Sequence, residues 1–305
     1  MTRPINDRDL SVVIPAYRCA TFLPAAIASA LRSPAVEVII AENSSDDDTL
    51  AVARAWRDRY PDRIRILETS RTIPVVGANL NRGFREVRTP FAMRVDGDDI
   101  ALTSHIGHAI ARFKADDKLG VVSGLYTNIR ATEHTDPSHA PADPEIPPEG
   151  YRQLSGVEAG RFVLGWDPSL ASTGTIFRME AWNEVGGFDP TLTWGEDWEL
   201  WFRIARHWSI GYFTSPITLY RSNTTGLTSG HLQQDRLCFQ YDYIYTAARR
   251  LWPERELRAQ FRRAFFRSAR TYCGSALRAV ERRRFAEVPG RAVRGILGLA
   301  RAAAI

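Results

Sequence analysis

Short apolar runs alternate with longer amphipathic stretches over the first hundred residues. The apolar runs are rich in β-branched residues, which favour strands, and they lie at 10–14, 36–41, 64–67 and 91–95. The stretches between them carry apolar residues at helical spacing and predict helices over 22–32, 49–60 and 78–88. Strands that alternate with helices in this way predict an α/β fold with a mostly parallel sheet flanked by helices.

The pattern changes beyond residue 128. Residues 130–150 contain five prolines and no periodicity, so we expect a loop or a lid there. An apolar segment at 170–178 and a helix from about 196 to 207 follow. From 231 onward the sequence predicts amphipathic, Arg-rich helices.

Composition excludes several classes of protein. With 44% hydrophobic and 25% charged residues, the chain of 305 residues resembles an ordinary globular protein and not a disordered one. No run approaches the ~18 apolar residues of a membrane-spanning helix, and the N-terminus is too polar for a secretory signal. The three cysteines lie far apart and form neither a disulfide framework nor a metal motif. We therefore expect a cytoplasmic protein.

Charge is concentrated near the C-terminus. Residues 246–305 hold 15 Arg and four acidic residues, a local net charge of +11 in a chain whose total is +5. A solvated helix face would explain this, and so would peripheral contact with the inner membrane surface or another anionic partner. Sedimentation with anionic liposomes tests the membrane hypothesis: it fails if nothing binds and deletion of 286–305 leaves activity unchanged.

Three carboxylates follow the strand at 91–95, in the sequence Asp96-Gly97-Asp98-Asp99. Such carboxylates repel one another unless a cation lies among them, and Mg²⁺ and Mn²⁺ commonly bind one or two carboxylates together with substrate phosphates. Gly97 would leave room for the approach of a diphosphate. The alternative is an exposed, Asp-rich turn that caps the next helix.

A second acidic cluster, Glu196-Asp197, lies between Trp194, Trp198 and Trp201. Acids at a helix start are stabilised by the helix dipole, which is sufficient to explain them. Aromatic neighbours also suggest a sugar-binding platform, and partial burial would raise the pKa of a carboxyl group toward that of a useful general base.

Other polar residues follow the predicted strands, whose carboxyl ends form the ligand-binding edge of an open α/β sheet. Tyr17, just after the first strand, would stack on a base, and Glu42, after the second, would accept hydrogen bonds from a base or ribose. Asn81 and Gly83 are candidates for ligand contact or for simple helix punctuation.

In their order along the chain, these segments resemble the family-2 glycosyltransferases of the GT-A fold. The resemblance covers about residues 10–225. It rests on the segments Ser11–Tyr17, Val38–Thr49, Asn81–Gly83, Thr89–Asp99, Thr173–Arg178, Val185–Asp189 and Gly195–Arg203.

The resemblance implies a role for each matching residue. A nucleoside-diphosphate sugar would be bound by Pro15, Ala16, Tyr17, Glu42, Asn81, Asp96 and Gly97. Asp98 would be the principal ligand of a Mn²⁺ or Mg²⁺ ion, with Asp96 beside it. Asp197 would be the general base, and Trp194 and Glu196 would lie on the acceptor side.

The implied reaction is an inverting single displacement from a nucleoside-diphosphate sugar, with a UDP-sugar favoured, to a saccharide, natural-product or lipid-linked acceptor. The implied organisation is a GT-A domain over 1–225, with a nucleotide-sugar half at about 1–128 and an acceptor half at 129–225. A helical extension would span 226–305.

The sequence departs from the family pattern in three places. Glu42 stands where the family usually has Asp, so the identity of the donor nucleotide is not determined by the resemblance. Tyr220-Arg-Ser-Asn223 lacks the His of a common Tyr-Arg-x-His motif, unless His231 substitutes for it. The Gln-x-x-Arg-Trp signature of processive members is absent, so we expect the addition of one sugar.

Two other classes remain as alternatives. A nucleotidyltransferase or sugar-nucleotide synthase would carry a glycine-rich phosphate loop after the first strand, and residues 15–20 contain no glycine. A nucleic-acid-binding protein would interleave exposed aromatic residues with its basic ones, which the C-terminal region lacks, so we expect no nucleic-acid partner. The sequence does not determine which sugar is transferred, which acceptor receives it or the oligomeric state. The Arg-rich, Lys-poor composition is associated with a bacterial source.

Overall fold

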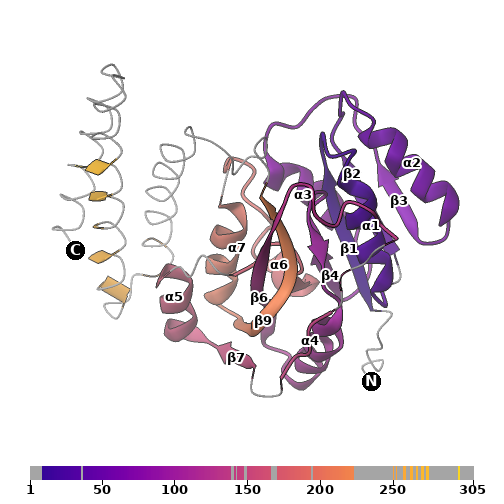
Figure 1. The fold of residues 1–305 in the computed structure, drawn as a ribbon. Helices are drawn as coiled ribbons and strands as arrows, with labels where there is room; N and C mark the ends of the chain where they lie inside the picture. The colour runs from indigo at the N-terminus through magenta and orange to yellow at the C-terminus, as the bar shows by residue number, and fades with distance from the viewer. Residues whose placement is uncertain are drawn as a thin grey trace.

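The computed structural model describes residues 9–35, 37–138, 141, 143–147, 150–165, 170–193 and 195–222, together with isolated positions from 250 to 295 (Figure 1). Its centre is a sheet flanked by helices, so the predicted α/β class is confirmed. No helix of the described residues is both long and apolar enough to cross a membrane.

The alternating strands and helices predicted for the first hundred residues are all present. They are β1 (Leu10–Ala16), α1 (Leu23–Arg32), β2 (Glu37–Glu42), α2 (Thr49–Arg59), β3 (Ile64–Leu67), α3 (Val76–Arg85) and β4 (Phe91–Arg94). The four strands pair in parallel in the order β3-β2-β1-β4. This half of the sheet therefore has the predicted parallel arrangement.

The second half of the chain extends the same sheet with mixed pairings. Its elements are β5 (Ile100–Ala101), α4 (Ser104–Ala115), β6 (Leu119–Arg130), β7 (Tyr151–Leu154), α5 (Gly156–Gly165), β8 (Ile176–Arg178), α6 (Met179–Glu184), α7 (Glu196–Ala205) and β9 (Ser209–Ser222). Strand β8 runs antiparallel between β4 and β6, and β6 then pairs in parallel with β9. The end of β9 thereby comes to lie beside β5, which follows the Asp-rich turn.

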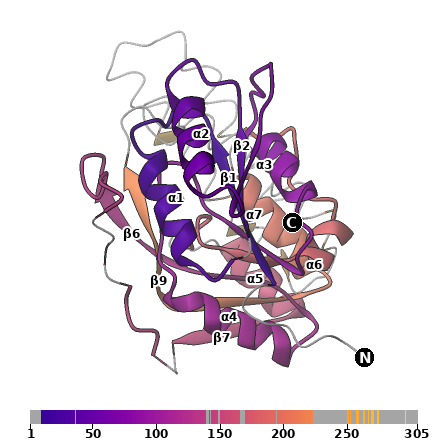
Figure 2. The ribbon, with the colours of Figure 1, turned by 90° about the vertical axis from the view of Figure 1, so that its right-hand side faces the viewer.

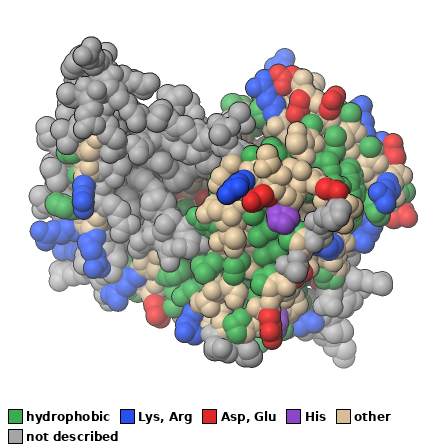
Figure 3. Space-filling model, viewed as in Figure 1, with side chains coloured by type: hydrophobic (Ala, Val, Ile, Leu, Met, Phe, Trp, Pro, Cys, Tyr) green, Lys and Arg blue, Asp and Glu red, His purple; other side chains and the backbone are tan. Residues whose placement is uncertain are grey.

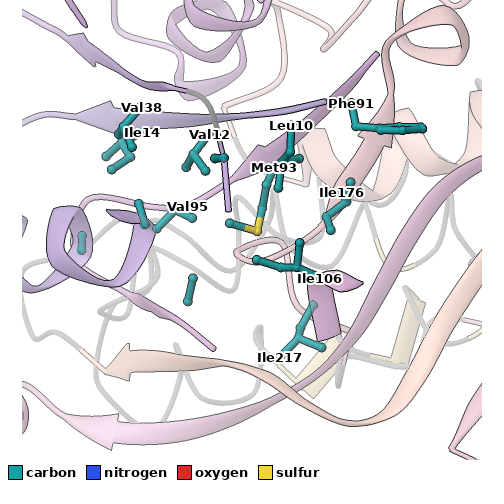
Figure 4. Close-up of a cluster of buried hydrophobic side chains, with 14 of the residues drawn as sticks. Leu10, Val12, Ile14, Val38, Phe91, Met93, Val95, Ile106, Ile176 and Ile217 are labelled. Carbon is teal, nitrogen blue, oxygen red and sulfur yellow. The ribbon is translucent and has the colours of Figure 1, made fainter. Parts of the chain in front are cut away.

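Alternate residues of β1 enter two different hydrophobic layers. Leu10, Val12 and Ile14 pack with side chains of α1, α2 and α4 on one face of the sheet (Figure 4). Val13 packs with α3, α6 and α7 on the other face. Figure 2 shows α1 and α7 separated by β1. A strand that is buried on both faces needs a continuous apolar run, which is what β1 carries.

A buried arginine, Arg178 at the end of β8, forms hydrogen bonds with the backbone of the segments that precede and begin β6. Its guanidinium donates hydrogen bonds to the backbone carbonyls of Leu119, Phe113 and Asp116. The ring of Phe91 lies 5.5 Å from the guanidinium carbon. Arg178 is thus a structural side chain that satisfies several carbonyl groups at once, because a guanidinium carries five N–H donors.

The predicted extension over 226–305 lies mostly outside the described residues. Trp252 is 2% exposed, and its ring would lie 3.3 Å from a Cβ placed at Gly160 of α5. The exposed positions described in this segment include five arginines and one phenylalanine: Arg250, Arg258, Arg262, Arg263, Phe266 and Arg270. Figure 3 shows several basic side chains at the left of the molecule, where the described positions of this segment lie in Figure 1.

We predict that Gly83→Ala destabilises the fold, because a Cβ there would lie 2.3 Å from Cγ1 of Val13 and would push α3 away from β1. Overpacking of this kind costs about 1–3 kcal/mol of unfolding free energy. Gly107, in α4, is the matched control: nothing lies within 4 Å of its Cβ position, so Gly107→Ala gains up to about 1 kcal/mol in helix propensity. Urea unfolding of both variants measures the difference, and equal effects would contradict the packing argument.

Candidate active site

The carboxyl ends of β1, β2 and β4 lie at one edge of the sheet. In the register of the strands, Ala16 pairs with Glu42 and Val13 pairs with Arg94. The backbone N–H of Val95 also donates to the carbonyl of Val13, which continues the β1–β4 pairing toward the Asp-rich turn. The residues that follow these three strands are therefore brought together, as the parallel arrangement led us to expect.

Glu42 organises the turn after β2. Its side chain is 1% exposed, and its two carboxylate oxygens accept hydrogen bonds from the backbone N–H groups of Ser44 at 3.0 Å and Ser45 at 2.7 Å. Ser44 has a positive φ of 56°, so these bonds hold a turn in an uncommon conformation. A contact between Glu42 and a base or ribose would use the lone pairs that remain.

Tyr17 and its neighbours form the end of β1. The Tyr17 side chain is 41% exposed, and the guanidinium carbon of Arg18 lies 5.3 Å from the centre of its ring. Pro15 is partly exposed, and Ala16 is buried. Of these residues, Tyr17 is the one whose side chain presents an exposed surface for stacking.

The four residues of the Asp96–Asp99 turn have different environments. Both oxygens of Asp96 accept hydrogen bonds from Arg94, at 2.7 and 3.0 Å. Asp99 is 1% exposed, and burial, reinforced by the two neighbouring aspartates, raises its pKa well above the usual range. Asp98 is partly exposed. The expectation of an exposed, helix-capping turn is therefore wrong for Asp99.

Gly97 has a structural reason to be glycine. A Cβ there would lie 2.9 Å from the Cys19 sulfur and 2.9 Å from the Pro15 carbonyl oxygen. The space that the missing side chain leaves is therefore filled by the end of β1. A contact between Gly97 and the nucleotide sugar stays a prediction.

Arg94 connects the two acidic clusters. Besides its two bonds to Asp96, its guanidinium donates to an oxygen of Glu196 at 3.0 Å, and Arg94 itself is 5% exposed. Burial lowers the pKa of Arg94, but the two carboxylates outweigh that effect and the net pKa is raised. One buried cation thus joins the turn after β4 to the start of α7.

Glu196 is 7% exposed and lies against Arg94. Its carboxylate is held in this ion pair, and its place on the acceptor side stays a prediction. Trp198 and Trp201 are each 5% exposed and belong to the hydrophobic core, so they do not form the sugar platform that their spacing suggested. Trp194 lies outside the described residues.

Asp197 is the partly exposed carboxylate in the first turn of α7. The other two acids of that turn, Glu196 and Glu199, are buried and paired with arginines. Burial raises the pKa of Asp197, and the nearby Arg94 offsets this only in part. One oxygen of Asp197 accepts the N–H of Trp198 at 2.7 Å, which fixes the orientation of the carboxylate.

Asn81 is buried between α3 and the segment before α7. It is 4% exposed, its amide NH₂ donates to the Phe188 carbonyl at 2.8 Å, and its oxygen accepts the Phe188 N–H at 2.9 Å. The side chain therefore ties α3 to the turn before α7. A contact between Asn81 and the nucleotide stays a prediction.

Sequence reasoning missed three residues that hold the Asp-rich turn: Arg94, Thr173 and Arg221. The Thr173 hydroxyl donates to Asp99 at 2.8 Å and accepts the backbone N–H of Asp96 at 3.2 Å. A charged residue inside the otherwise apolar strand at 91–95 was a usable signal for Arg94. For Arg221, the signal was only its place in Tyr220-Arg-Ser-Asn223, which resembles the Tyr-Arg-x-His motif except at its last residue.

The donor set is suited to a cation that arrives with a diphosphate. No three His, Cys, Asp or Glu side chains of the described residues converge as a metal site. Asp98 supplies a partly exposed carboxylate, and the charge of Asp96 is already matched by Arg94. One or two carboxylates plus substrate phosphates are the usual ligands of Mg²⁺ in such sites, so these residues fit the metal.

Comparisons with known proteins identify the family of the chain. Residues 11–186 match the model of the family described as "Glycosyl transferase family 2". An uncharacterized glycosyltransferase of Rickettsia bellii is 26% identical over 69% of this chain, which spans only 29% of that protein. A second one, from Rickettsia prowazekii, is 24% identical, with 77% of this chain and 71% of that protein covered.

Two solved structures share the fold. The mannosyltransferase PcManGT from Pyrobaculum calidifontis, in complex with GDP-Man and Mn²⁺, has a TM-score of 0.55 at 15% identity, covering 97% of this chain and 86% of its own. S. aureus TarS 1–349, in complex with UDP-GlcNAc, has a TM-score of 0.53 at 14% identity, covering 94% and 88%. At this identity the likeness concerns the fold alone.

We predict that Arg94→Met lowers the free energy of unfolding at neutral pH by about 3–5 kcal/mol, because it leaves two buried carboxylates without their cation. The loss shrinks as the pH falls, since burial raises the pKa of Glu196 and its protonation removes part of the uncompensated charge. Arg54→Met is the control, because the Arg54–Glu68 pair is exposed and worth at most about 1 kcal/mol. Urea unfolding at two pH values measures this, and equal losses in the two variants would contradict the prediction.

Proposed function

We propose that this chain, which belongs to glycosyl transferase family 2, moves one sugar from a nucleoside-diphosphate sugar to an acceptor hydroxyl. The observation that carries the proposal is the Arg94 bridge, which places a metal-type Asp turn next to a helix bearing a carboxylate of raised pKa. We favour a UDP-sugar as the donor. The complexes of related folds with UDP-GlcNAc and with GDP-Man support a sugar nucleotide in general.

The donor would lie along the edge formed by β1, β2 and β4. Tyr17 stacks on the base, and Glu42, with Pro15 and Ala16, contacts the base and ribose. Asp96 lies at the ribose or the diphosphate. Asp98 is the principal ligand of Mn²⁺ or Mg²⁺, and the bound ion supplies Lewis-acid stabilisation of the departing diphosphate.

Asp197 acts as the general base. Its carboxylate accepts the proton of the acceptor hydroxyl while that oxygen attacks the anomeric carbon in line with the leaving group. The new carbon–oxygen bond forms as the bond to the diphosphate breaks, and the electron pair leaves on the diphosphate. A single in-line displacement inverts the anomeric configuration and needs no covalent enzyme intermediate.

Surroundings select Asp197 over the other acids of α7. Glu196 and Glu199 form ion pairs with Arg94 and Arg203, and each is less than one-tenth exposed. Burial raises the pKa of Glu196 as well, so exposure, and not the pKa, distinguishes Asp197 from Glu196. Asp197 has the raised pKa and the partial exposure that proton transfer requires.

Peripheral contact with an anionic membrane surface remains part of the proposal. The exposed positions Arg258, Arg262, Phe266 and Arg270 are spaced four residues apart, which places basic groups and one aromatic ring near one face of a helix. Such faces bind anionic lipid surfaces.

We predict that one of UDP, GDP and dTDP binds with micromolar affinity in the presence of Mn²⁺, with UDP expected. Calorimetric titration of each nucleotide, with and without Mn²⁺, measures this. In the Asp98→Ala variant the metal-dependent part of the affinity is lost, because the principal carboxylate ligand is gone. Binding that is indifferent to metal, or no binding to any diphosphate, would remove the metal-dependent mechanism.

We predict that Asp197→Asn lowers the turnover rate by about 10²–10⁴-fold and leaves nucleotide affinity unchanged, because the base acts on the acceptor and not on the donor. In the wild type the rate falls as the pH drops through the raised pKa of Asp197, so the acid limb lies above the usual range for Asp. The variant loses that limb.

Asp58→Asn, at an exposed carboxylate of α2 paired with Arg57, is the control and keeps the wild-type pH profile. Once an acceptor has been found by screening, initial rates across pH test the prediction. An Asp197→Asn variant with near-wild-type turnover would exclude Asp197 as the base.

A further inference from the structure

Arg221, near the end of β9, is a buried cation that the mechanism above does not use. It is 2% exposed, and the guanidinium carbon lies 4.9 Å from the centre of the Phe22 ring. Its N–H groups donate to the backbone carbonyls of Asp98, Arg130, Ala131, Glu133 and His134. One side chain therefore joins the proposed metal turn to the segment 130–134.

The hydrogen bonds to the Asp-rich turn come from two parts of Arg221. Its Nε donates to the carbonyl oxygen of Asp98 at 2.7 Å, and its backbone N–H donates to a carboxylate oxygen of Asp99 at 2.8 Å. Thr173 holds the turn at Asp96 and at the other oxygen of Asp99. Among these hydrogen bonds, the one to the Asp98 backbone is made by the Arg221 side chain, whereas the others reach Asp96 or Asp99.

An arginine with a purely structural role would need no hydrogen bond to the turn that is proposed to bind the divalent metal ion. Arg178 shows what such a role looks like: it also donates to several backbone carbonyls and stacks near aromatic rings, but none of its partners belongs to the Asp-rich turn. The difference between the two arginines is the bond to Asp98. Arg178 therefore serves as a matched control.

We propose that Arg221 is a positioning residue that fixes the backbone of Asp98, so that the Asp98 carboxylate is held ready for the divalent cation. The inference rests on the proposed function, because it assumes that Asp98 binds the metal. Residues that orient metal ligands are typically worth 10- to 100-fold in metal affinity, so the loss of the Arg221 guanidinium should weaken binding by about that factor. Segment 130–134 is held by the same guanidinium and should loosen with it.

The test is the dissociation constant of Mn²⁺ in the presence of saturating UDP, measured by calorimetry on the full chain. The variants are Arg221→Met, Arg221→Lys and Arg178→Met, each with its thermal unfolding midpoint. We expect Arg221→Met to raise the dissociation constant about 10- to 100-fold. Arg221→Lys should fall between that variant and the wild type, because a single ammonium cannot serve carbonyls on both segments. Arg178→Met should lower the midpoint and leave the dissociation constant unchanged.

An unchanged constant in Arg221→Met, or an equal loss in Arg178→Met, would overturn the inference while the proposed function stands. Absence of Mn²⁺ binding in the wild type would overturn the proposed metal site and this inference with it. If Arg221→Met does not fold, Phe22→Leu removes only the ring beside the guanidinium. A smaller rise in the constant is then expected, and no rise overturns the inference.

Discussion

A buried guanidinium must be paired, and this requirement joins the two halves of the molecule. Arg94 lies between Asp96, two residues along its own strand extension, and Glu196, 102 positions further along the chain. Removing a charge from water costs several kcal/mol unless opposite charges and hydrogen bonds compensate for it. The Asp-rich turn and the start of α7 therefore cannot separate without leaving charges buried and unpaired. The proposed metal ligand and the proposed base derive their common location from this pairing.

The requirement that buried charges be paired or hydrogen-bonded also distinguishes the acidic residues of the site from one another. Asp96, Glu196 and Glu199 are neutralised by arginines, and Asp99 is held by two hydrogen bonds in the interior. Asp98 and Asp197 are partly exposed, and so is Asp96, but Asp96 is held by Arg94. Structural and chemical carboxylates thus alternate along each short motif, so a motif alone does not tell which acid has which role.

Much of the fold was predictable because its first half is local. Each strand and helix up to β4 carries its own periodicity, and parallel pairing of successive strands follows from their alternation with helices. Strand β9 was missed because its pattern is interrupted: Pro216 lies within it, and its pairing with β6 shifts register near Leu125. Such pairing depends on residues some ninety positions apart, which no local window contains.

Clustered aspartates identified the candidate site, but the roles of its neighbours depend on packing that the sequence does not display. Gly97 and Asn81 were predicted to contact the nucleotide sugar and Trp201 to form a sugar platform, and the structure shows that each packs against or bonds to the protein itself. Arg94 and Arg221 were overlooked because their partners lie 87 to 123 residues away, apart from Asp96 beside Arg94. Residue type suggests the chemistry, and tertiary contacts decide which residue performs it.

The most direct measurement of the central claim is a double-mutant cycle on unfolding free energy with Arg94→Met, Glu196→Gln and the double variant, by urea unfolding at neutral pH. If Arg94 and Glu196 form the bridge, the double variant is less destabilised than the sum of the single variants by about 0.5–3 kcal/mol. Additive losses, within about 0.5 kcal/mol, would show that the two residues do not interact and would contradict the account of a site held together by one buried cation.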